Sequence, residues 1–302
     1  MKILVTGGLG FVGSNLVDKL VERGNDVTII DNMSSISSSE TYMNEKATYV
    51  FGGIENILTG WFNLEDFDII FHLAAEARIQ PSFEDPAHWF MSNAYGTVAM
   101  LDFARKTNCK SFVYATTSSK NHGSLISPYT FSKVVGEDAV RMYADIYGMN
   151  TAMATFYNVY GPREPREGEF ATVTEKFLRQ YENGGPLTIV GDGQQSRDFT
   201  HVDDICEGLI RISEGQWNGH NFDLGRGEPV KIIDLAKAVC EGDEGYIHFV
   251  PLRKNEGLHT ESDWKKTETL LKWRAKRNIL DYVKERVKSM HNKLGTVARI
   301  DE

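Results

Sequence analysis

A doubly wound parallel sheet of the Rossmann type, followed by a smaller mixed α/β lobe, is the fold that the sequence predicts. Three observations lead to this prediction: a strand that runs into a glycine-rich turn and a helix, short apolar runs that alternate with helical patterns, and a change of texture near residue 156. Alternating strands and helices imply a parallel sheet that is covered on both faces.

The chain opens with a strand, a tight turn and a helix. Lys2–Thr6 is a short apolar run that ends in a turn with glycines at positions 7, 10 and 13, after which apolar residues recur at helical spacing. Gly7 permits the turn, Gly10 lets the backbone approach a pyrophosphate, and Gly13 lets the helix lie close to the sheet. The helix terminus then offers unpaired amides to the anion. This pattern predicts a dinucleotide site, although for the glycines alone a turn without a ligand is the alternative.

The second strand, expected over 27–30, indicates which dinucleotide binds. It ends in Asp31, at about the position where an acid binds the adenosine ribose. A carboxylate accepts a hydrogen bond from a 2′-hydroxyl and repels a 2′-phosphate. The sequence therefore favours NAD over NADP.

Further strands are expected over 48–51, 68–73, 111–115 and 151–156, with helical patterns near 83–107 and 129–147. Beyond about residue 156, glycine and proline clusters punctuate shorter elements. We expect residues 1–160 to form the NAD-binding domain, with 198–224 returning to it. Residues 161–197 and 225–302 are expected to form the substrate-binding lobe, which closes over the carboxyl ends of the strands.

Composition narrows the class of protein. The chain has 302 residues, 41% of them hydrophobic, and a net charge of -9, which argues against a general nucleic-acid binder. Its apolar runs are strand-sized and a strand begins at Lys2, so we expect neither a membrane span nor a signal peptide. Three widely spaced cysteines indicate reduced thiols and a cytoplasmic protein. No histidine has partners at metal-ligand spacing, so no metal is expected.

The segment 127–133 carries the chemistry. Ser127 is a good helix cap and Pro128 suits the first helical position, so Tyr129 and Lys133 lie on one face, one turn apart. Two cations, a lysine and an oxidised nicotinamide, at roughly 6 Å and a dielectric of about 20 would each stabilise a phenolate by ~3 kcal/mol. A tyrosinate near neutral pH is therefore expected. A tyrosine and a lysine paired on an ordinary helix surface is the alternative.

These motifs together identify a resemblance that covers nearly all of the chain. The chain resembles the extended short-chain dehydrogenases/reductases, in particular the NAD-dependent nucleotide-sugar epimerases and dehydratases. Besides the glycine turn and the Tyr129–Lys133 pair, the matching stretches are Asp31 Asn32, 71–75, Asn93 with Gly96 and Thr97, 112–115, 157–163, and 191–199 with its Gly-Asp-Gly and Arg-Asp-Phe.

The resemblance implies roles for individual residues. NAD would be a resident cofactor, a nucleotide-diphosphate sugar would be the substrate, and Ser118, Tyr129 and Lys133 would be catalytic. Of the hydroxyls at 116–119, alignment of the strand selects Ser118. The implied cofactor-binding residues are Gly7, Gly10, Phe11, Val12, Asp31, Asn32, Ile54, Leu73, Ala74, Ala75, Asn93, Tyr129 and Lys133. The implied substrate-binding residues are Ser118, Asn158, Val190, Arg197, Arg253 and Thr260.

The residues after position 118 indicate the reaction. Dehydratases and decarboxylases of this family carry an acidic residue there, whereas this chain has Ser118, Ser119 and Lys120. The pattern fits oxidation and re-reduction at one carbon, as in a 4-epimerase. A related reductase or decarboxylase, and a redox-inactive NAD-binding regulator, are the alternatives. The small Thr260 suggests tolerance of a 2-acetamido group, so UDP-N-acetylglucosamine and its galacto epimer join UDP-glucose and UDP-galactose as expected substrates.

Two departures from the family pattern affect the site. Ten residues separate Ser118 from Tyr129, where the family usually has about twice as many, so the pocket is open or another loop fills it. Gly53 stands where an aspartate usually holds the adenine amine, which predicts weaker cofactor retention.

The resemblance also implies a homodimer through helices 92–107 and 129–147. Met100, Phe103, Val140 and Tyr143 are expected either at that interface or in the core.

Overall fold

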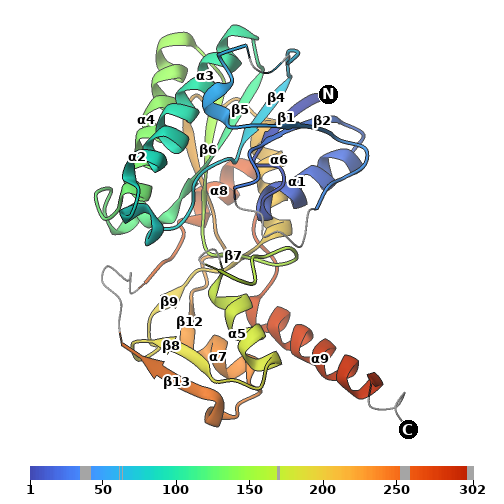
Figure 1. Ribbon diagram of the computed structural model, residues 1–302. Helices are drawn as coiled ribbons and strands as arrows, with labels where there is room; N and C mark the ends of the chain where they lie inside the picture. Colours follow the sequence, from blue (N-terminus) through green and yellow to red (C-terminus); the bar gives the residue numbers. More distant parts are fainter. Residues whose placement is uncertain (35–41, 61, 63, 169–170, 252–258, 298–302) are drawn as a thin grey trace.

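The computed structural model describes residues 1–34, 42–60, 62, 64–168, 171–251 and 259–297. A central sheet with helices on both faces forms one part, and a second group of elements lies at one end of that sheet (Figure 1).

The central sheet has seven strands in the order β11-β6-β5-β4-β1-β2-β3, and all its neighbours pair in parallel. Strand β1 lies between β2 and β4, so the direction of winding reverses beside it, and ligands bind at such a reversal. The strands are β1 (Lys2–Thr6), β2 (Asp26–Asp31), β3 (Thr48–Phe51), β4 (Ile69–His72), β5 (Ser111–Thr117), β6 (Thr151–Phe156) and β11 (His220–Leu224).

Helices cover both faces of the sheet, and the central strands β1, β4, β5 and β6 are buried over most of their length. Ile3 and Val5 of β1 pack with helices α1 (Phe11–Glu22) and α6 (Val202–Ser213), while Leu4 packs with the opposite layer. That layer consists of α3 (Gly96–Lys106) and α4 (Pro128–Tyr147). Residues 202–224 thus pack with the amino-terminal sheet, as α6 on its face and β11 at its edge (Figure 1).

The helical pattern near 83–107 is not one regular helix. After a short 3-10 turn, η2 (Pro81–Phe83), the chain forms α2 (Pro86–Trp89), a π-helical turn η3 (Phe90–Tyr95) and then α3. π-helical turns often occur at functional sites. Ser92 in this turn lines the cavity described below.

The four residues that were expected either in the core or at a dimer interface belong to the core. Met100, Val140 and Tyr143 are at most 6% exposed, and Phe103 packs against the same cluster. The faces that α4 and η3 turn to solvent carry other apolar residues.

The second group of elements has its own core. It is built on α5 (Val173–Glu182), α7 (Ile232–Val239) and α9 (Ile279–Val297) together with the parallel pair β8 (Leu187–Val190) and β13 (Ile247–Val250). Two short pairs link it to the rest: β7 (Val159–Tyr160) with β10 (Thr200–His201), and β9 (Ser196–Arg197) with β12 (Val230–Lys231). The remaining elements are η1 (Ile54–Asn56), η4 (Ser118–His122), η5 (Glu244–Tyr246) and α8 (Trp264–Leu271).

Within the described ranges, every helix is too short or too polar to span a bilayer.

Candidate active site

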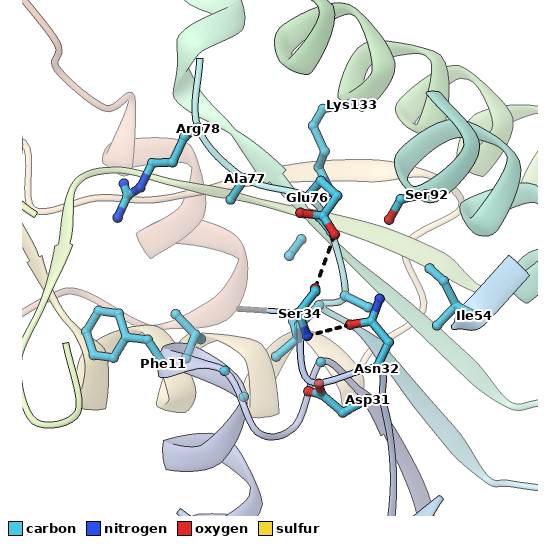
Figure 2. Close-up of a pocket in the computed structure, with 18 of the residues that line it drawn as sticks. Phe11, Asp31, Asn32, Ser34, Ile54, Glu76, Ala77, Arg78, Ser92 and Lys133 are labelled. Carbon is cyan, nitrogen blue, oxygen red and sulfur yellow. Dashed lines mark hydrogen bonds between the residues drawn. The ribbon is translucent and has the colours of Figure 1, made fainter. Parts of the chain in front are cut away.

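A cavity of about 320 Å³ opens at the carboxyl ends of the central strands (Figure 2). It brings together residues from the glycine turn, from the ends of β2 and β4, and from the start of α4. Twelve of the thirteen predicted cofactor-binding residues line it: Gly7, Gly10, Phe11, Val12, Asp31, Asn32, Ile54, Leu73, Ala74, Ala75, Tyr129 and Lys133.

The glycine turn has the geometry of an anion cradle. Gly7 has a φ of 71°, and a Cβ on it would lie 2.8 Å from the amide nitrogen of Ala74. A Cβ on Gly13 would lie 2.0 Å from the carbonyl oxygen of Gly7. Helix α1 begins with Gly10 as its cap and no side chain bound to its first amides, which remain suited to a pyrophosphate.

Asp31 is held in place for a ribose. One carboxylate oxygen accepts a hydrogen bond from the Leu9 amide at 3.0 Å and the other from the Met33 amide at 2.7 Å. Burial raises the pKa of Asp31, while these two amides lower it. Each oxygen keeps lone-pair capacity for a hydroxyl donor, so the residues present fit NAD.

The space beside Gly53 contains a carboxylate after all. A Cβ built on Gly53 would lie 1.9 Å from Oε1 of Glu55, and Glu55 lines the cavity. The side chain two residues further along therefore occupies the position that the sequence suggested was empty. We expect Glu55 to offset the weaker NAD retention predicted from Gly53.

Asn93 does not line the cavity. Its side chain is buried and forms hydrogen bonds with residues of the cavity wall and of α4. Its oxygen accepts from the Glu76 amide at 2.8 Å, and its nitrogen donates to the Glu76 carbonyl at 2.9 Å and to Ser132 Oγ at 3.1 Å. Asn93 thus holds the chain after β4 against α4, so we assign it a supporting role in place of direct cofactor binding.

The chain after β4 also supplies residues that the sequence did not single out: Glu76, Ala77 and Arg78. The Glu76 carboxylate accepts a hydrogen bond from Ser34 Oγ at 3.2 Å, which joins the ends of β4 and β2 across the cavity (Figure 2). Its other neighbour is His88 Nε2, at 3.4 Å. Residues 76–78 follow strand β4, which ends at the site, and this position was the feature of the sequence that could have indicated them.

Tyr129 and Lys133 are placed by the start of α4. Ser127 caps the helix by accepting from the Thr130 amide at 3.1 Å, and Pro128 follows at the first helical position, as predicted. Burial raises the pKa of Tyr129, whereas a hydrogen bond with Thr117 and the charge of Arg78 lower it. Without a bound dinucleotide the phenol therefore stays neutral at pH 7.

The Lys133 amine is buried under the sheet end. Its nitrogen lies 4.2 Å from the centre of the Tyr114 ring. Burial lowers the pKa of Lys133 to about 7, although the charge of Glu137 one turn later raises it. The charge on Lys133 therefore depends on pH in the neutral range.

Thr117, the last residue of β5, takes the place that the sequence suggested for Ser118. The Thr117 side chain is hydrogen-bonded to the Tyr129 hydroxyl and also accepts from the Ser119 amide, whereas Ser118 is the first residue of η4. Neither residue is among those that line the cavity. One residue of register at the end of a strand turns a side chain to the opposite face. Our proposal for the catalytic hydroxyl is accordingly Thr117.

Replacement of Thr117 by valine should lower kcat roughly 10²-fold, the effect of losing one hydrogen-bond donor at a reacting oxygen. The Ser118→Ala variant serves as the control and should stay within about twofold of the wild type. Steady-state kinetics on both variants checks this prediction, and equal losses would contradict the assignment.

The start of the short segment between Ser118 and Tyr129 contacts the end of the sheet, while residues 121–125 are exposed. Lys120 turns inward and its amine lies 2.6 Å from Glu137 Oε1 and 3.3 Å from Thr155 Oγ1. The amide of Asn121 donates to the Tyr157 hydroxyl at 3.2 Å. In this shortened segment, the ion pair between Lys120 and Glu137, which is partly buried, occupies part of the space at the end of the sheet.

The predicted substrate-binding residues that the structure describes are not among those that line this cavity. Arg197 in β9 is close enough to His122 of η4 to lower the pKa of that imidazole, which places it near the catalytic end. Thr260 Oγ1 accepts from the Asp198 amide at 3.0 Å. Asn158 is exposed beside β7 and Val190 ends β8, while Arg253 lies outside the described residues.

Comparison with known proteins identifies the family. The model of the NAD dependent epimerase/dehydratase family matches residues 3–225. The chain belongs to this family. Two curated relatives are each 30% identical: a putative UDP-glucose 4-epimerase of Methanocaldococcus jannaschii, over 96% of this chain and 98% of the relative, and UDP-glucuronic acid decarboxylase 2 of Arabidopsis thaliana, over 91% and 65%.

Solved structures agree with the family assignment. A UDP-glucose 4-epimerase of Thermotoga maritima with UDP-glucose is similar at a TM-score of 0.88 and 30% identity, over 97% of this chain and 100% of that one. A dTDP-glucose 4,6-dehydratase of Streptomyces venezuelae, solved with NAD, has a TM-score of 0.86 and 25% identity, over 98% of each chain. The family member described here is thus an NAD-dependent enzyme with the predicted Rossmann-type fold.

Glu164, in the loop after β7, should make the stability of this family member depend on pH between 6 and 9. Burial raises its pKa to about 8, so the folded state holds a proton that the unfolded chain releases near the ordinary carboxyl range. That stabilisation is complete below the unfolded pKa and is lost as pH rises through about 8. Between pH 6 and 9 the free energy of unfolding of the wild type should therefore fall by about 1–3 kcal/mol more than that of the Glu164→Gln variant.

Thermal unfolding across this pH range tests the expectation. The Glu167→Gln variant of a nearby exposed carboxylate is the matched control. A wild type whose Tm is flat from pH 6 to 9 would contradict it.

Proposed function

We propose that this protein is a nucleotide-sugar 4-epimerase, acting on UDP-glucose and UDP-galactose, on UDP-N-acetylglucosamine and its galacto epimer, or on both pairs. The observation that supports this proposal is that Tyr129, which lines the dinucleotide cavity, is hydrogen-bonded to the side chain of Thr117. The residues that follow Thr117, from Ser118 to Lys120, include no carboxylate. Elimination or decarboxylation would need such a further acid or base.

The residues present divide the work as follows. The glycine turn and Asp31 would hold NAD, which when bound supplies the hydride acceptor and donor. Thr117 would hold the sugar 4-oxygen. Tyr129 would take the hydroxyl proton as the carbonyl forms, and return it after the ketosugar has turned its opposite face to the ring. Lys133 would stabilise the ionised phenol and the ribose hydroxyls.

Incubation of the purified protein with a panel of nucleotide sugars, without added cofactor, tests the proposal. The panel contains UDP-glucose, UDP-N-acetylglucosamine and UDP-glucuronic acid, and proton NMR follows each sugar. Inversion at C4 is the expected result, with the Tyr129→Phe variant as an inactive control. Release of carbon dioxide, net consumption of reduced cofactor, or no turnover would contradict it.

We also propose a homodimer, formed through the faces that η3 and α4 turn to solvent. Met91 and Tyr95 of η3 and Met142, Ile146 and Tyr147 of α4 are all exposed, between 41% and 66%. Apolar side chains gathered on neighbouring helices favour association.

The Ile146→Asp variant should weaken dimerisation at least about tenfold, because a charge would be buried at the interface. Light scattering during gel filtration measures the mass. The Leu270→Asp variant on α8, whose leucine is 43% exposed, should leave the mass unchanged. A wild-type monomer would contradict the proposal.

A further inference from the structure

Arg78 occupies an unusual position in the chain after β4. It lines the same cavity as Tyr129 and Lys133, and Figure 2 shows its side chain together with that of Lys133. Its φ is 100°, in the region that favours glycine, and a side chain held there is strained. Such strain in a site is retained when the surrounding structure imposes it, and it often accompanies function. The position therefore warrants an account of what the guanidinium does there.

The charges around Tyr129 show what it can do. Burial raises the pKa of Tyr129, and in the protein without dinucleotide the charge of Arg78 lowers it. Burial lowers the pKa of Arg78, while the charges of Tyr129 and Glu164 raise it. Lys133 stands one turn along α4, and burial lowers its pKa to about 7, so its charge is partly lost at neutral pH. A guanidinium stays protonated throughout this range. The other titratable groups around this end of the cavity are Tyr114 on β5, His72 on β4, Glu137 on α4 and Lys120 on η4.

We propose that Arg78 is a positioning residue that stabilises the ionised hydroxyl of Tyr129 during turnover. This inference rests on the proposed role of Tyr129 as the acid and base of the reaction. Arg78 supplies a cation that does not titrate, while Lys133 supplies one that does. The division explains why a long charged side chain stands at a position whose backbone favours glycine.

The test measures the titration of Tyr129 directly, in protein saturated with NAD and labelled with ¹³Cζ-tyrosine. The Tyr129→Phe variant assigns the resonance among the 12 tyrosines. Arg78→Gln and Arg78→Gly should both raise the midpoint by about one pH unit, the effect of removing one nearby charge. Arg78→Lys should restore most of the shift. Arg78→Gly also relieves the backbone strain, so it separates the effect of charge from that of folding.

The matched control is Arg163→Gln, which removes another arginine at positive φ, 70°, that is paired with Asp18 outside the cavity. It should leave the Tyr129 midpoint unchanged. An unchanged midpoint in both Arg78→Gln and Arg78→Gly, or a Lys variant that behaves like the Gln variant, would overturn the inference. So would a wild-type Tyr129 that stays neutral up to pH 10. The titration of Tyr129 needs no sugar. Its result can therefore be interpreted even if none of the nucleotide sugars in the panel is converted.

Discussion

Replacement of Tyr129 by phenylalanine should lower turnover of the nucleotide sugar about 10²–10⁴-fold, the range for loss of a general acid or base. The phenyl ring keeps the packing at the start of α4 but removes the hydroxyl that Thr117 binds. Because the change removes a proton-transfer group, kcat should fall far more than KM rises.

The binding of NAD separates loss of chemistry from loss of structure. Gly7 and Gly13 on the glycine turn and Asp31 are unaffected by the change, so NAD affinity measured by calorimetry should stay within about threefold of the wild type. The Tyr147→Phe variant, at an exposed tyrosine of the same helix, is the matched control and should retain its activity. A Tyr129→Phe variant with normal turnover would remove the proposed mechanism.

The parts of the site that the sequence predicted depend on local spacing. The turn at Gly7, Gly10 and Gly13 and the pair Tyr129 and Lys133 are separated by a few residues within one element, so helical and turn geometry fixes their relation. The strand bounds followed from the apolar runs, since both faces of the sheet are buried. Local spacing was therefore sufficient to predict the glycine turn and the pair Tyr129 and Lys133.

The parts that sequence missed depend on register or on contacts between distant segments. Thr117 and Ser118 differ by one step at the end of β5, and only the tertiary position of α4 shows which of them meets Tyr129. Glu55 reaches the space of the absent side chain at Gly53 only because the chain turns there into η1. Arg78 needs a positive φ, which no spacing pattern of apolar residues reveals for a non-glycine residue.

Asp198 illustrates the same limit on the substrate side, and its replacement by alanine should lower the free energy of unfolding by about 3–5 kcal/mol. From the sequence, Asp198 had no predicted role beyond the Arg-Asp-Phe match, yet its side chain is fully buried. One oxygen accepts from the Arg226 amide at 3.0 Å, and the other from the amides of Gly227 at 2.9 Å and Ser262 at 3.0 Å. Alanine would leave three amides without this acceptor, that of Ser262 buried and those of Arg226 and Gly227 partly buried, which is the costly case.

The loss of these hydrogen bonds should also disturb the predicted substrate-binding residues, because Asp198 connects its own strand end with residues 226–227 and 260–262. Its own amide donates to Thr260, and Arg197 precedes it in the chain. Hydrogen exchange should therefore accelerate at 225–227 and 259–263, and KM for the nucleotide sugar should rise. The exposed Asp192, which accepts only from the Gln194 amide among the contacts described, is the matched control, and Asp192→Ala should cost at most about 0.5 kcal/mol. Equal stability of the two variants would show that the Asp198 network does not hold these segments together.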